Sequence, residues 1–394
     1  LGPAQLGLLN YSIAFVSLFS AISSLGLSGI VVRELVREPD KREEILASAF
    51  VMLVLAGVMT FLLALAAIFF LRPADILSQL LVALVALGMI LFQSFTVIEY
   101  WFTSQVQSKY TVYARNAAFL VLALVKIVLL LSSAPLIAFA LALMAEMVLG
   151  ALLLLVVYRA KGLSLRLGKA KKSRCLGLLR DSWPAAISTV SVALLLKTDI
   201  VMLGEMVGNE AVGIYSVATT ISIFWHFLPI IIVSSVCPFI IQAKADNEAI
   251  YIQRITQLFS LMTALALPII VVIMVSADAL ISFLYGNLYA AAGPVLAIHI
   301  IGCWVVFLAH AQEPWDIAEN MLRFNMFKSV SAVFINIGLN LVLIPHYQTI
   351  GAATASVVAL VISGVVLNLV SEKARPIFFI QIKSLLIYRY FNDK

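Results

Sequence analysis

Charged residues are scarce in this chain. Lys, Arg, Asp and Glu make up 12% of its 394 residues, whereas a soluble domain carries about 25%. Hydrophobic residues make up 63%, and the mean hydropathy is +1.08. This composition excludes a water-soluble fold.

Cysteine and catalytic motifs are also scarce. Cys175, Cys237 and Cys303 have neither CxxC nor histidine spacing, so no metal site or disulfide framework is indicated. No phosphate loop, zinc motif or Ser/His/Asp order is present, which leaves ATP hydrolysis and metal or nucleophilic catalysis without machinery. We therefore predict no cofactor, no metal, no catalytic residue and no nucleic-acid partner, and a transporter rather than an enzyme.

Long apolar runs fill most of the chain. A bilayer core of about 30 Å needs roughly 20 apolar residues per helix. Residues 45–71 are apolar nearly throughout, unlike the short alternating strands of a membrane β-barrel. The sequence predicts an all-α polytopic membrane protein with eleven transmembrane helices, at 5–31, 45–71, 75–97, 112–132, 135–158, 183–204, 212–240, 256–277, 292–311, 326–344 and 350–370.

Basic residues gather in alternate connections. Of 26 Lys and Arg residues, 23 lie in or directly beside every second connection or in the tail, Arg72 lies in another connection, and Lys126 and Lys197 lie well inside spans. Because cytoplasmic loops retain positive charge, this pattern predicts a cytoplasmic C-terminus. Eleven spans then place Leu1 outside, although no signal peptide precedes the first span. We expect a twelfth helix upstream of Leu1.

A short internal repeat agrees with that expectation. Residues 1–12 and 207–216 share an apolar-Gly-x-x-x-apolar-Gly pattern before a long apolar run. Chance similarity is the alternative, but both following spans run from outside to inside by the charge pattern. We therefore predict two parallel six-helix lobes related by an axis along the membrane normal. Their expected parts are an N-terminal lobe at 1–158 that lacks its first helix, a basic inter-lobe loop at 159–182, a C-terminal lobe at 183–370 and a basic cytoplasmic tail at 371–394.

The inter-lobe loop and the tail have a composition typical of membrane surfaces. Residues 159–181 carry eight positive charges and one negative charge. This charge favours a topology determinant lying on anionic lipid over a specific binding site. The stretch 377–391 mixes apolar residues with Lys383 and Arg389, which predicts a segment lying along the inner surface.

Four charged residues lie well inside predicted spans, away from their ends: Lys126, Glu146, Lys197 and Asp199. Each costs about 2.5–3.5 kcal/mol on insertion scales, so each needs an explanation. One hypothesis is that Lys126 and Lys197 attract an anionic substrate along a hydrated path, with Asp199 and Glu146 available for proton or Na⁺ coupling. In the structural alternative, Lys126 reaches outward to the interface and Asp199 accepts hydrogen bonds from a neighbouring helix.

Aromatic residues cluster with polar or charged side chains at the inner end of one predicted span and within later spans. Glu99, Tyr100 and Trp101 precede Arg115, and Trp225 adjoins a histidine in a later span. Aromatic rings stack on sugars and arginine binds phosphate, as a glycolipid headgroup requires. The alternative is an interfacial aromatic belt beside the usual cytoplasmic charges.

Several ordered blocks of sequence carry a family resemblance over essentially the whole chain. They are LGPAQLGLLNYSIAFVSLFSAISSLGLSGIVVREL, EYWFTSQVQSKYTVYARNAAFLV, LLRDSWPAAIS, LLLKTDIVMLGEMVGNEAVGIYSVA and LIPHYQTIGAATASV. With these blocks the chain resembles bacterial oligosaccharide flippases of the Wzx type. Those flippases belong to the multidrug/oligosaccharidyl-lipid/polysaccharide exporter superfamily.

The resemblance implies a fold, an activity and partners. The expected protein has twelve helices in the bacterial inner membrane. By alternating access it moves undecaprenyl-pyrophosphate-linked oligosaccharide units, such as the O-antigen of lipopolysaccharide, from the cytoplasmic to the periplasmic leaflet. Its expected partners are that lipid-linked oligosaccharide, membrane lipids, a polysaccharide polymerase and a chain-length regulator. By resemblance, Asp199 falls in the family's Lys-x-Asp block, and Arg33 and Arg115 fall on basic positions of the first lobe.

Two other functions compete with this one. A cation-coupled multidrug antiporter of the same superfamily would need a more acidic first lobe than Lys126 and Glu146 provide. A membrane glycosyltransferase or polymerase usually carries a large extramembrane domain, whereas the longest predicted loop here has about 24 residues.

Overall fold

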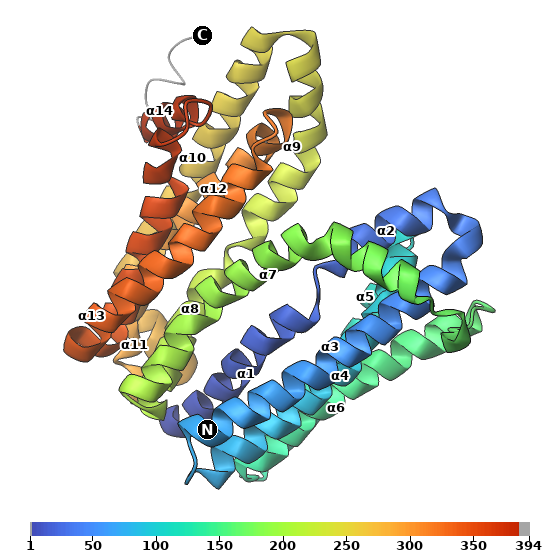
Figure 1. The fold of residues 1–394 in the computed structure, drawn as a ribbon. Coiled ribbons are helices and arrows are strands. Elements are labelled where there is room, and N and C mark those ends of the chain that lie inside the picture. Colours follow the sequence, from blue (N-terminus) through green and yellow to red (C-terminus); the bar gives the residue numbers. More distant parts are fainter. Residues whose placement is uncertain (1, 386–394) are drawn as a thin grey trace. The chain divides into compact units, whose positions relative to one another are not determined.

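The computed structural model describes residues 2–385, which form helices joined by short connections and no β-strand (Figure 1). These residues divide into two compact units. The first unit contains Leu8–Lys197, and the second contains Gly2–Gly7 and the chain from Thr198 onward. The division therefore falls inside one helix, whereas the sequence placed the lobe boundary in the loop before that helix. The end of the predicted tail, residues 386–394, lies outside the described residues.

The first unit is a helical bundle whose long members pack side by side (Figure 1). Its interior contains Leu27, Ile45, Leu53, Phe102 and Tyr158, all almost fully buried. The helices are α1 (Pro3–Ser23) from Leu8 onward, α2 (Leu27–Arg37), α3 (Arg42–Leu71), α4 (Ile76–Ser104), α5 (Lys109–Leu131), α6 (Leu136–Ala160) and the first part of α7 (Lys172–Met206), with short 3-10 turns at Pro39–Lys41 (η1) and Leu167–Lys169 (η2).

Glycine breaks the first span of this unit. Gly26 separates α1 from α2 and has a φ of 61°, in the left-handed region that glycine adopts without steric cost. A Cβ atom at Gly26 would lie 2.3 Å from the backbone nitrogen of Ala186. Only glycine satisfies both conditions, so α1 and α2 form one bent span.

The second unit contains the remaining helices. These are the end of α7, then α8 (Asn209–Phe224), α9 (Phe227–Asp246), α10 (Glu248–Tyr285), α11 (Ala292–His299), α12 (Gly302–Ala318), α13 (Leu322–Gly364) and α14 (Arg375–Ser384), with 3-10 turns at Asn287–Tyr289 (η3) and Val366–Leu369 (η4). The α8–α9 and α11–α12 pairs each form one interrupted span. The short α14 lies within the predicted tail.

The element α13 consists of two helices joined by a tight reversal. Gln348 has a φ of 49° and a ψ of −123°, which no α-helix contains. A Cβ atom at Gly351 would lie 2.4 Å from the carbonyl oxygen of Leu343, although residues eight apart in one helix are about 12 Å apart. The described residues contain ten apolar segments long enough to cross a membrane. The segment that contains α13 holds two of the predicted spans, 326–344 and 350–370, because it reverses at Gln348. The prediction of an all-α protein with eleven transmembrane helices is confirmed.

The two copies of the sequence repeat pack against each other within the second unit. A Cβ atom at Gly7 would lie 1.7 Å from the carbonyl oxygen of Asn209, and one at Gly213 would lie 2.0 Å from that of Pro3. The second glycine of each copy therefore touches the backbone at the start of the other copy. This reciprocity indicates that the repeat is structural and not a chance similarity.

Candidate functional site

A fully buried polar cluster surrounds Asp199 in the second unit. Tyr215 Oη on α8 donates to Asp199 Oδ2 at 2.7 Å. From the first helix of α13, the side-chain amides of Asn336 and Asn340 donate to Oδ1 at 2.9 and 2.6 Å. From its second helix, Ser356 Oγ donates to Oδ2. One carboxylate thus joins α7, α8 and both helices of α13.

The cluster places a buried carboxylate among hydrogen-bond donors. The side chain of Asp199 is 3% exposed, and no basic side chain contacts it within residues 2–385. Burying an ionised carboxylate is costly, and hydrogen bonds to the charged form offset part of that cost. The Oδ1 of Asn340 is buried here without a hydrogen-bond partner. Asp199 and Asn340 therefore offer oxygen atoms, which hard cations prefer as ligands.

A histidine extends the cluster. The ring of His299 on α11 packs edge-on to Tyr215, with ring centroids 6.1 Å apart. Its Nδ1 lies 2.9 Å from Ser222 Oγ on α8. Local spacing in the sequence gives no sign of these contacts, because Tyr215 and Ser222 lie 84 and 77 positions before His299.

Lys197 lies two residues before Asp199 on α7 but makes no contact with that carboxylate. It is half-buried, and no carboxylate pairs with it in the described part of the chain. Among the four charged residues that the sequence places inside spans, Lys197 alone is left without an ion-pair or hydrogen-bond partner in residues 2–385. Its role in attracting an anion stays a prediction.

Arg115 and Glu99 form a two-point ion pair in the first unit. Arg115 Nε lies 2.6 Å from Glu99 Oε1, and Nη2 lies 2.8 Å from Oε2. The guanidinium also stacks over the ring of Phe92 at 4.9 Å. Arg115 side-chain atoms remain 48% exposed, so an incoming phosphate would compete with Glu99 for a guanidinium that is already oriented.

The aromatic residues predicted as substrate contacts are held by packing and polar contacts of their own. Tyr100 is half-buried and its hydroxyl lies 3.3 Å from Thr96 Oγ1. The ring of Trp101 is covered by the Arg42 guanidinium at 5.1 Å. In the second unit, Trp225 occupies the break between α8 and α9 and packs edge-on to Phe224.

Lys126 and Glu146 pair with each other across α5 and α6. Lys126 Nζ lies 2.5 Å from Glu146 Oε2, and both side chains are about one quarter exposed. The sequence left Lys126 either reaching outward or lining a substrate path, and treated Glu146 as a separate coupling candidate. The pairing accounts for both charges, because each neutralises the other in the membrane interior.

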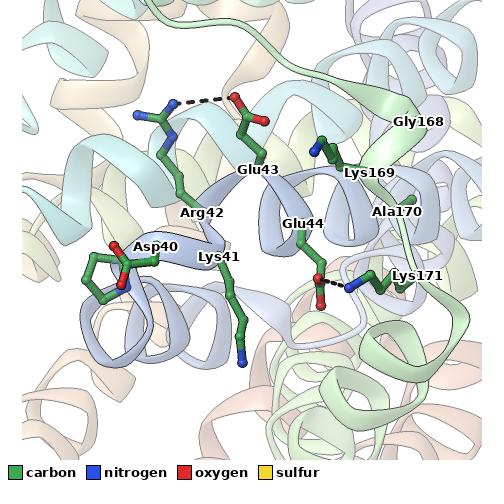
Figure 2. A pocket seen from close by; sticks show the side chains of 10 residues that line it. Asp40, Lys41, Arg42, Glu43, Glu44, Gly168, Lys169, Ala170 and Lys171 are labelled. Carbon is green, nitrogen blue, oxygen red and sulfur yellow. Dashed lines mark ion pairs between the residues drawn. The ribbon is translucent and has the colours of Figure 1, made fainter.

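The inter-lobe loop is fastened to the first unit by ion pairs. Arg174 contacts Glu34, Glu38 and Glu44 at 3.2, 2.6 and 3.4 Å. Its neighbour Lys171 lies 2.6 Å from Glu44, at the edge of a polar pocket of about 460 Å³ that Figure 2 shows between η1 and η2. Part of the loop's positive charge is thus neutralised within the protein, and an association of the rest with anionic lipid stays a prediction.

Arg33 lies beside these ion pairs, because it contacts Glu34, which also contacts Arg174. It pairs with Asp181 on α7 and with Glu34, its neighbour on α2. Arg33 and Arg115, the two basic positions carried over from the family resemblance, are therefore both engaged by carboxylates.

Sequence reasoning identified Asp199 but missed its partners. Asn336 and Asn340 are four residues apart in an apolar helix, which places both on one face. Polar pairs of this kind inside a span are a detectable signal. No local signal links them to Asp199, since more than 130 residues intervene.

Comparison with known proteins identifies the family. Residues 1–244, more than half of the chain, match the family described as "Polysaccharide biosynthesis protein". The chain belongs to this family. Over 178 residues, the chain is 29% identical to "Probable flippase AglR" of Haloferax volcanii, an alignment that covers 42% of the chain and 36% of that relative. The match thus spans little more than a third of the relative's length.

Solved structures share the fold of this chain. An inward-facing multidrug resistance MATE family transporter of the MOP superfamily matches with a TM-score of 0.77 and 12% identity, over 98% of this chain and 92% of that one. The lipid II flippase MurJ, in an inward closed conformation, matches with a TM-score of 0.74 and 12% identity, over 100% of this chain and 91% of that one. At such identities the likeness establishes the fold.

Proposed function

We propose that this protein is a flippase that moves a polyprenyl-linked oligosaccharide across the cytoplasmic membrane and uses the Asp199 cluster to couple transport to a cation. The substrate class is undecaprenyl-pyrophosphate-linked repeat units of O-antigen or another surface polysaccharide. Transport runs from the cytoplasmic to the periplasmic leaflet of a bacterial inner membrane, with the C-terminus of the protein in the cytoplasm. The family membership and the named flippase relative support the activity.

The buried carboxylate of Asp199 is the observation that carries the coupling part of the proposal. A protein that needed only packing at this point would place an apolar residue there, because a buried charge costs free energy. Asp199 on α7 instead accepts hydrogen bonds from side chains on α8 and α13. Binding or losing a cation there would therefore change the packing of α7, α8 and α13. Such a dependence is what couples ion binding to a conformational change.

The substrate part of the proposal depends on cationic side chains. A pyrophosphate headgroup needs a hydrated route with positive charge, while the polyprenyl tail stays in lipid. Arg115 offers an oriented guanidinium at the level of the aromatic pair Tyr100 and Trp101. Arg33, Lys126, Lys197 and Trp225 complete the proposed substrate contacts, and Glu146, which pairs with Lys126, is the second proposed ion-coupling residue.

The test replaces the two central residues in a host strain that lacks its own flippase for the same polysaccharide. Asp199→Asn keeps the size of the side chain and removes its charge, and Arg115→Ala removes the guanidinium. Matched controls are Glu210→Gln and Arg159→Ala, which change exposed residues of the same charge. We expect both test variants to trap lipid-linked repeat units on the cytoplasmic leaflet while the controls restore surface polysaccharide.

The outcomes separate the competing functions. Normal surface polysaccharide with both test variants would remove Asp199 and Arg115 from the mechanism. Drug efflux by the wild-type protein without any rescue of polysaccharide would instead assign the cation-coupled antiporter. Incorporation of labelled sugar into polymer by the purified protein would assign a glycosyltransferase or polymerase.

A further inference from the structure

A groove between α9 and α10 is apolar along its length and basic at one end. Its volume is about 410 Å³, within the range of small-ligand sites. Ile240 and Leu258 form a buried floor, whereas Phe239 and Leu261 on its walls are 63% and 46% exposed. The residues that line it are Val236, Phe239, Ile240, Arg254, Gln257, Leu258 and Leu261.

The direction of the groove follows from helix geometry. Leu258 and Leu261 follow Arg254 by four and seven residues, so all three lie on one stripe of α10. The helical rise places Arg254 about 10 Å from Leu261 along the axis. Arg254 follows the α9–α10 connection, which the charge pattern assigns to the cytoplasmic side. The groove therefore leads from the predicted membrane surface into the apolar layer.

The Arg254 guanidinium, at the basic end of the groove, is held by a hydrogen bond but is not neutralised by a carboxylate of the described residues. Arg254 Nη1 donates to the carbonyl oxygen of Phe239 at 2.7 Å, and no carboxylate pairs with Arg254 within residues 2–385. Lys244, at the end of α9, differs from it because Glu248 and Glu319 both contact its Nζ. Arg254 thus keeps its remaining N–H groups for an external anion.

We infer that this groove binds one acyl chain of an anionic glycerophospholipid, with the lipid phosphate on Arg254. A guanidinium with one nitrogen held by the protein matches the two free oxygens of a single phosphodiester. The carrier of the proposed transport reaction fits less well, since it brings two linked phosphates and a long tail to a groove about 10 Å deep. The site shares no residue with the Asp199 cluster, so it goes beyond the proposed function.

The test measures lipid retention by the purified full chain. Protein is taken from vesicles of phosphatidylglycerol and phosphatidylcholine, and the lipids that remain bound are counted by native mass spectrometry. We expect retained phosphatidylglycerol to fall about fivefold in Arg254→Ala, the loss typical of one cation at a membrane surface. Leu261→Trp should lower retention by filling the groove, and Arg254→Lys should retain an intermediate amount. Arg323→Ala, which removes an exposed arginine elsewhere in the second unit, is the control.

The result that overturns the inference is equal retention of phosphatidylglycerol by Arg254→Ala and the wild-type protein. Recovery of a polyprenyl phosphate as the bound lipid would overturn it too, because the occupant would then be the carrier. Arg254 is exposed, so the alanine variant tests the site even if Leu261→Trp fails to fold. Retention is measured without transport, so this test can fail while the proposed function stands.

Discussion

Asn340 Nδ2 donates a hydrogen bond to Asp199 Oδ1 at 2.6 Å, although 141 residues separate the two side chains. This contact fastens the first helix of α13 to α7. Asn340 is fully buried, so its loss would leave part of the carboxylate without a donor.

We expect Asn340→Ala to destabilise the protein by about 1–3 kcal/mol, the usual cost of an unsatisfied buried polar group. Thermal unfolding in detergent measures this effect. Thr354→Ala is a matched control, because Thr354 lies on the same element, is half-buried, and donates its hydroxyl hydrogen to the carbonyl oxygen of Ile350 instead of to Asp199. Equal melting temperatures for Asn340→Ala and the wild-type protein would show that the hydrogen bond contributes nothing.

Because Lys126 and Glu146 form an ion pair, we expect each single substitution to destabilise the protein more than the double substitution does. Lys126→Met or Glu146→Met alone leaves one unpaired charge in the membrane, which costs about 2.5–3.5 kcal/mol on insertion scales. The double methionine variant removes both charges, so its expression and melting temperature should recover. Additive losses in the double variant would contradict the pairing.

We expect alanine substitutions at the glycines of the repeat to destabilise the protein. A Cβ atom at Gly213 would overlap the Pro3 carbonyl oxygen, so Gly213→Ala should separate α8 from the start of α1 and lower the melting temperature. Gly177 lies in α7 with no atom near its Cβ position, and Gly177→Ala should stabilise the helix by about 1 kcal/mol. A stabilising effect at both positions would argue against the close backbone contact.

We expect the contribution of Glu38 to the stability of the protein to depend on pH. Its hydrogen bonds to Arg174 and then Lys41 lower the pKa of Glu38 from 4.5 to about 2. Because the folded pKa lies below the unfolded one, the contribution of Glu38 to stability is complete above pH 4.5 and declines as the pH falls toward 2. The melting-temperature difference between the wild-type protein and Glu38→Gln should therefore persist at pH 5 and shrink by pH 3. A difference that does not change with pH would exclude this ion pair as its source.

The sequence by itself determined the class of fold and the number of spans. In lipid every backbone polar group must be bonded internally, so a run of about 20 apolar residues has few choices other than a helix. Residues 45–71 show this, since α3 covers nearly the same stretch. The glycine repeat was visible in the sequence as well, because a close backbone approach tolerates no side chain.

Only the tertiary structure decided which polar residues meet. Lys126 and Glu146 are 20 residues apart, and Asp199 and Ser356 are 157 apart, so no helical periodicity relates them. The choice of partner depends on how helices cross, which is set by side-chain packing along their whole length. For this reason the sequence singled out Asp199 as a costly buried charge, while Tyr215, Asn336, Asn340 and Ser356 were identified as its partners by the fold.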